Sequence, residues 1–79
     1  MNYYEIVLIS KVTQIKLYYP SVKGLKGAKR HASKFAKLLA NYRAIYTAQE
    51  INIYYVNKSA DIRELKAQRL KGEDWQTYA

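Results

Sequence analysis

The amino-acid sequence predicts an α+β domain in which a small antiparallel sheet carries one amphipathic helix on one face. Runs of β-branched and aromatic residues occur in both halves of the chain, and a central stretch has helical periodicity. With 79 residues, three glycines and one proline, the chain has the length of a single small domain. We therefore expect residues 1–79 to form one compact unit with the order β-β-α-β, followed by a terminal hairpin or a short helix.

Two strands are predicted first. Residues 3–12, YYEIVLISKV, are rich in β-branched and aromatic types, and both faces are apolar, which is typical of a central strand. Residues 14–19, QIKLYY, alternate as a half-buried strand does, and a turn near 11–13 would make the two strands antiparallel. Pro20 is expected to end the second strand, because proline has no N–H to donate to a ladder.

One amphipathic helix is predicted next, from Ser21 or Gly24 to about Asn41. Its apolar side chains span a little under half of the circumference and are expected to pack on the sheet; they are Leu25, Ala28, Ala32, Phe35, Ala36, Leu38 and Leu39. The opposite side carries Lys26, Lys29, Arg30, Ser33, Lys34 and Lys37. His31 falls toward the buried side, where we expect it to pack rather than to react.

A third extended region is predicted over residues 43–56, and its clearest part is the strand 51–56. The segment TAQE, residues 47–50, reads as either a bulge or a helical turn. Residues 57–61 have the composition of a turn.

The C-terminal stretch is open to two interpretations. Weak helical spacing is carried by Ile62, Leu65 and Leu70, and Asp61 could cap such a helix. However, KGED before Trp75 predicts a hairpin turn between strands at 67–70 and 75–78. We expect the hairpin, with room for a short helical turn before it.

Positive charge is concentrated in the first half of the chain. The formal net charge is +8, and residues 1–43 hold nine Lys or Arg against the single acid Glu5, whereas residues 44–79 hold five of each sign. Such a field attracts polyanions, although lysines on a helix are often only solvated. Neighbouring like charges on a helix repel by a few tenths of a kcal/mol, which favours a negative partner. The expected contacts are Lys23, Lys26, Lys29, Arg30, Lys34, Lys37 and Arg43.

Nine tyrosines form the second signal. Tyr18, Tyr54 and either Tyr3 or Tyr4 are predicted on the sheet face that the helix leaves open. There, Tyr18 and Tyr54 could stack bases or contact a protein. Half-buried strands also favour tyrosine, which accounts for most of these residues without any partner.

The sequence offers little material for catalysis. His31 is the only histidine, there is no cysteine, and the acids lack metal-ligand spacing. GLKG, residues 24–27, lacks the pattern of a phosphate-binding loop. We therefore expect a non-catalytic binding protein with no metal and no cofactor. The longest apolar runs are too short to span a bilayer, so we expect no membrane partner and an intracellular location.

Two strands before LKGAKRHASK, and KGEDW late in the chain, resemble a class of very small phage-encoded proteins. Some members are anti-CRISPR proteins directed at type I Cascade surveillance complexes. The matching residues are Ala28, Lys29, Arg30, Ala32, Ser33, Gly72 and Trp75.

The resemblance implies an inhibitor that docks on a CRISPR-Cas complex in the host cytoplasm and blocks binding of target DNA. With its positive charge, the chain is not expected to mimic DNA. The alternative is a small basic protein that binds nucleic acid directly through the same helix face. The expected partner is thus a Cas protein complex or nucleic acid. An open edge strand would allow a homodimer as well as a monomer.

Overall fold

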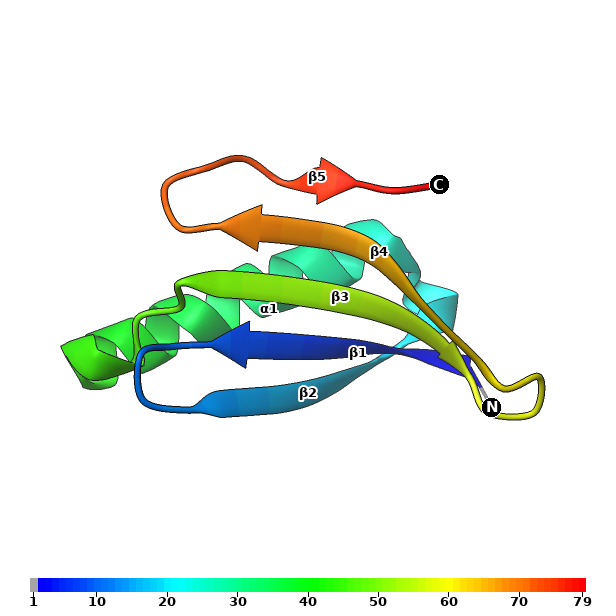
Figure 1. Ribbon diagram of the computed structural model, residues 1–79, viewed down its shortest axis with the longest axis horizontal. Helices are drawn as coiled ribbons and strands as arrows, with labels where there is room; N and C mark the ends of the chain where they lie inside the picture. Colours follow the sequence, from blue (N-terminus) through cyan, green and yellow to red (C-terminus); the bar gives the residue numbers. More distant parts are fainter. Residues whose placement is uncertain (1) are drawn as a thin grey trace.

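The chain folds into a five-stranded antiparallel sheet with one long helix, α1, packed across one face (Figure 1). The computed structural model describes residues 2–79, and it confirms the predicted α+β class. Along the sheet the strand order is β2-β1-β3-β4-β5. The elements are β1 Asn2–Ile9, β2 Gln14–Pro20, η1 Ser21–Lys23, α1 Gly24–Tyr42, η2 Ala44–Tyr46, β3 Glu50–Asn57, β4 Ile62–Leu70 and β5 Gln76–Thr77.

β1 lies between β2 and β3, as expected of a strand with two apolar faces. It is shorter than predicted, because Ser10 begins the turn: its N–H donates to the Thr13 carbonyl at 2.9 Å, and its hydroxyl oxygen accepts from the Thr13 N–H at 3.1 Å. β2 ends at Pro20, as predicted.

α1 begins at Gly24, one of the two predicted starts, after the short 3₁₀ turn η1. Gly24 has a φ of 85°, a value that a residue without a Cβ adopts at no steric cost. The helix ends at Tyr42, one residue beyond the predicted stop, because Arg43 is extended and its N–H donates to the Leu39 carbonyl at 3.0 Å.

The core lies between one stripe of α1 and the middle of the sheet. Ala28, Ala32 and Ala36 are buried on the helix side, and their small side chains let the helix approach the strands closely. The prediction for Leu38 is wrong, because its side chain is 58% exposed. Leu38 lies about 120° around the helix from Ala32. It therefore projects past β2, which is the edge of the sheet and leaves no strand beneath it.

The residues between α1 and β3 are less extended than predicted. A 3₁₀ turn, η2, occupies Ala44–Tyr46. Of the segment 47–50, residues 47–49 form the connection into β3 and Glu50 is the first residue of that strand, so the segment is neither a bulge nor a helical turn. Within the connection, the Gln49 N–H donates to the Ile9 carbonyl at 2.7 Å. The strand predicted at 51–56 is confirmed within β3.

β4 is a continuous strand from Ile62, so the helix interpretation of this segment is wrong, as is the helical turn allowed before the hairpin. Asp61 caps nothing there; it lies in the predicted 57–61 turn with a φ of 54°. The good helix formers of β4 are overridden because the strand pairs with β3 along its whole length, with one register shift opposite Ile53 and Tyr54.

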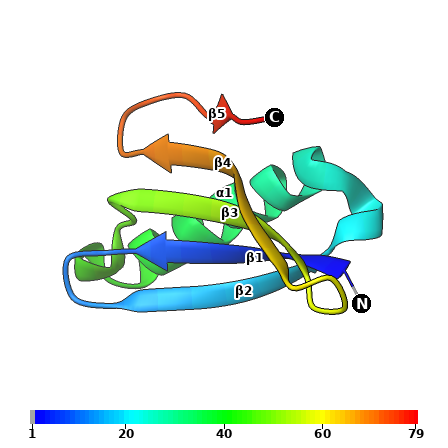
Figure 2. The ribbon, with the colours of Figure 1, turned by 45° about the vertical axis from the view of Figure 1, so that its right-hand side comes forward.

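The terminal hairpin is confirmed, with KGED in its connection. Its last strand is only Gln76–Thr77, shorter than the predicted 75–78. Trp75 lies outside the paired residues, and its half-buried ring packs on the core. When the molecule is turned, α1 stays on one side of the sheet, and no element within residues 2–79 covers the other side (Figure 2). None of the helices in this described part is long and apolar enough to cross a membrane.

Candidate polyanion-binding face

Four cations form a line along the outer side of α1, which we call the cationic row: Lys26, Arg30, Lys34 and Lys37. All four are exposed. Their spacing of four, four and three residues keeps them on one side of the helix. With a rise of 1.5 Å per residue, the row is about 16 Å long. Lys23 in η1 is also exposed, just before the N-terminal end of the helix, and its Nζ lies 5.9 Å from the centroid of the Tyr19 ring of β2.

No carboxylate neutralises this row within residues 2–79. The two ion pairs found there join Arg63 to Glu5 and Lys66 to Glu64, and neither involves the row. The helix dipole is not compensated by side chains either. Its positive N-terminal end has no acid in the first turn of α1, and its negative C-terminal end has no base in the last turn. The row therefore presents an uncompensated positive field.

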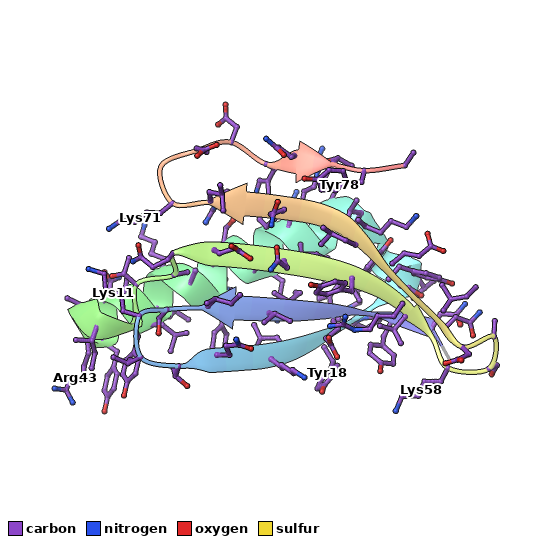
Figure 3. All side chains as sticks on the ribbon, in the orientation of Figure 1. Lys11, Tyr18, Arg43, Lys58, Lys71 and Tyr78 are labelled. Carbon is purple, nitrogen blue, oxygen red and sulfur yellow. The ribbon has the colours of Figure 1, made fainter. Side chains whose placement is uncertain are left out.

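Two of the predicted contacts lie away from the row. Lys29 is half-buried on the flank of α1, where its Nζ donates to the Thr77 hydroxyl of β5 at 2.5 Å. Arg43 is exposed just beyond the end of α1 and points outward at that end of the molecule (Figure 3). The structure thus brings together the four cations of the row, and Lys23 lies beside the N-terminal end of the helix, over Tyr19.

His31 packs against β2, as predicted from its place on the helix. It is half-buried, and the centroid of its ring lies 5.2 Å from the centroid of the Tyr19 ring. Gly27 gives Tyr19 room one turn earlier, since a Cβ there would lie 2.6 Å from the Tyr19 hydroxyl oxygen.

The open face of the sheet carries tyrosines that differ in exposure. Strand register puts Tyr3, Tyr18 and Tyr54 on this face, around Glu5. Tyr18, labelled on β2 in Figure 3, is 61% exposed. Its ring meets the Tyr3 ring edge to face, with the two centroids 5.4 Å apart. Tyr54 is less available, because the Arg63 guanidinium lies 3.8 Å from its ring centroid. Tyr18 is therefore the better placed of the two predicted aromatic contacts.

The Glu5–Arg63 pair keeps the centre of the open face neutral. Glu5 is buried, and its carboxylate accepts from Arg63 Nη2 at 2.7 Å. This hydrogen bond raises the pKa of Arg63 above its ordinary value, although burial opposes the shift. The guanidinium therefore stays charged well above neutral pH.

A second cationic feature was missed by sequence reasoning. A groove of about 360 Å³ lies between the C-terminal half of α1, the connection into β3 and the β4–β5 turn. Its lining includes Ser33, Lys37, Arg69 and Lys71. Arg69 lies in the strand predicted at 67–70, where its two-residue spacing to the buried Ala67 could have placed it toward the helix.

Comparisons with known proteins give no match that bears on the function. The chain matches no protein-family model, and neither a curated protein nor a solved structure matches it. Within residues 2–79, no group of three or more His, Cys, Asp or Glu side chains gathers in a way that could hold a metal ion.

Proposed function

We propose that this protein is a non-catalytic nucleic-acid-binding protein that contacts the phosphate backbone through the cationic row and Lys23. One observation carries the proposal: an exposed row of like charges on α1 has no carboxylate partner within residues 2–79. Adjacent members repel one another, so a bound polyanion would stabilise the helix as well as the complex.

The dimensions of the row suit a nucleic-acid backbone. One strand of B-DNA has a charge about every 3.4 Å along its axis, so a row of about 16 Å runs past about five phosphates. Lys23 and the row supply a similar number of cations. The net charge of +8 would also speed the encounter with a polyanion.

The second candidate is the inhibitor implied by the resemblance, which would dock on a CRISPR-Cas complex and block target DNA. An apolar hollow of about 490 Å³ beside the C-terminal end of α1 favours a protein partner. Around it, Val12, Tyr42 and Ile45 are exposed. Phosphate contacts would leave these side chains in water, whereas a protein interface would cover them.

Fluorescence anisotropy with a labelled 20-bp duplex and a single strand of the same length, over a range of salt concentrations, tests the first candidate. Engagement of most of the row gives a log–log slope of the affinity against salt of about −4 to −5 on duplex. Absence of binding to both probes at low salt would refute direct nucleic-acid binding.

Capture of a purified Cascade complex tests the second candidate. The inhibitor hypothesis predicts that the wild-type chain is captured and that K26E/R30E is captured less. No capture at low salt would remove that candidate, and capture undiminished in K26E/R30E would exclude the row as the contact surface.

A further inference from the structure

Arg69 in β4 is a half-buried cation without a carboxylate partner. Its Nη1 donates to the Ser33 hydroxyl at 3.0 Å, and its guanidinium carbon lies 5.1 Å from the Trp75 ring centroid. No carboxylate lies within ion-pair distance of it in residues 2–79. Partly desolvated charges are normally paired, so the environment of Arg69 is unusual.

Arg63 shows what a compensated arginine looks like on the same strand. It lies on the open face and is bonded to the Glu5 carboxylate at 2.7 Å. Arg69 faces the helix instead, where its polar partner, Ser33, is neutral. The two sites differ because Arg63 has a counterion and Arg69 has none within ion-pair distance in residues 2–79. The guanidinium of Arg69 instead borders the groove.

The walls of the groove add charge and a donor around Arg69. Lys37 and Lys71 are exposed cations at its rim, on α1 and after β4. The Ser33 oxygen accepts from Arg69, which leaves the hydroxyl hydrogen for a ligand. Glu73 also lines the groove, but it forms no ion pair with these cations. Three cations against one acid leave the groove positive.

We propose that this groove binds a phosphate group. Arg69, held by Ser33 and Trp75, presents a planar pair of donors to two phosphate oxygens. Lys37 and Lys71 neutralise the remaining charge. A volume of about 360 Å³ is near the lower end for ligand sites, about 300 to 1,000 Å³, which suits a phosphate with a small attached group.

The phosphate has two possible sources. Lys37 belongs both to the cationic row and to the groove, so the terminal phosphate of a strand bound along α1 could enter it. A free phosphomonoester would present the same group. The site itself does not depend on the proposed nucleic-acid binding, and the experiment separates the two sources.

The first arm titrates the full chain at constant ionic strength with inorganic phosphate, adenosine 5′-monophosphate and adenosine. Emission of Trp75, the only tryptophan, and the backbone amide NMR signals of Ser33 and Gly72 report on the groove. Phosphate and the monophosphate should give saturable changes, and adenosine none. Saturation by neither phosphate compound, or an equal response to adenosine, would overturn the proposal.

Variants then separate the groove from general charge. R69Q should weaken phosphate binding at least about tenfold, and K71Q, which alters only an exposed side chain, should weaken it by a smaller factor. K58Q removes the same charge at the other end of the molecule (Figure 3) and should change nothing. If R69Q does not fold, the comparison of the phosphate affinities of K71Q and K58Q tests the site. Equal affinities in the groove variants and K58Q would contradict the site.

The second arm compares oligonucleotides that end in a 5′-phosphate or a 5′-hydroxyl. A terminal-phosphate preference that R69Q abolishes identifies a strand end as the source, whereas phosphate binding without that preference identifies a free phosphomonoester. K26E/R30E should lose oligonucleotide binding and keep inorganic phosphate. The experiment therefore gives different results if the groove does not bind phosphate and if the row does not bind nucleic acid.

Discussion

Gly27 lies directly against Tyr19: a Cβ at Gly27 would come within 2.6 Å of the Tyr19 hydroxyl oxygen and 3.1 Å of a ring carbon. A Cβ that close to another side chain requires one of the two residues to shift. The glycine thus lets β2 and α1 approach each other, and Tyr19 in turn packs on His31.

Gly27→Ala should therefore have opposite effects in two backgrounds. Alanine adds about 1 kcal/mol of helix propensity, but the Tyr19 ring must move away. We expect a loss of about 1 kcal/mol in the wild type and a gain of up to about 1 kcal/mol with Tyr19→Ala. Urea unfolding of the four proteins in a double-mutant cycle measures this. Equal effects in both backgrounds would show that the close contact has no energetic consequence.

Arg63→Gln should destabilise the fold because it leaves the buried Glu5 carboxylate without its ionic partner. Breaking a fully buried pair costs about 3–5 kcal/mol. The Arg63 side chain is 51% exposed, so we expect only about 1–2 kcal/mol in urea unfolding. Since the pKa of Arg63 is raised, deprotonation of the guanidinium removes this contribution only under strongly alkaline conditions.

Glu64→Gln is the matched control for that measurement. Glu64 pairs with Lys66 at 3.1 Å, but it is largely exposed. Its removal should change stability by about 0.5 kcal/mol or less. A cost for Arg63→Gln no larger than that of the control would mean that solvent replaces the guanidinium at Glu5.

Ala32→Leu should be strongly destabilising, whereas Leu38→Ala should be nearly neutral. Ala32 is 0% exposed between α1 and the sheet, so added methylene groups force the layers apart at a cost of about 1–3 kcal/mol. Leu38 is 58% exposed and buries little surface. Thermal unfolding of both variants gives the comparison, and a larger loss for Leu38→Ala would contradict the packing described here.

Local patterns predicted the elements whose signals depend on nearby residues. Two apolar faces predicted that β1 is central, and KGED predicted the last turn. The strand predicted at 67–70 is the end of β4, but the first part of β4 was missed because good helix formers such as Arg63 and Glu64 occupy a segment whose state is set by pairing with β3. Helical periodicity put Leu38 at the edge of the apolar arc, but only the width of the sheet decides that this edge is uncovered.

The site follows the same division. Periodicity grouped Lys26, Arg30, Lys34 and Lys37 correctly on the outer side of α1. It could not show that Lys29 reaches Thr77, forty-eight residues later, or that Ser33 holds Arg69. Both contacts depend on how β4 and β5 extend the sheet beneath the helix.

The most direct test of the central claim compares two charge reversals of equal size on duplex DNA. K26E/R30E alters the row, and K11E/K58E alters two exposed cations in the turns after β1 and β3. In the row variant, one new carboxylate lies near the positive end of the helix dipole and the other lies four residues before Lys34. Both placements are favourable for α1, so the row variant should unfold no earlier than the wild type.

The salt slope of the affinity is the quantity to measure. If the row contacts phosphates, K26E/R30E should bind far more weakly, with a slope shallower by about two, and K11E/K58E should keep the wild-type slope. The same slope and the same loss of affinity in both variants would mean that net charge alone attracts DNA and that the row is not a binding face.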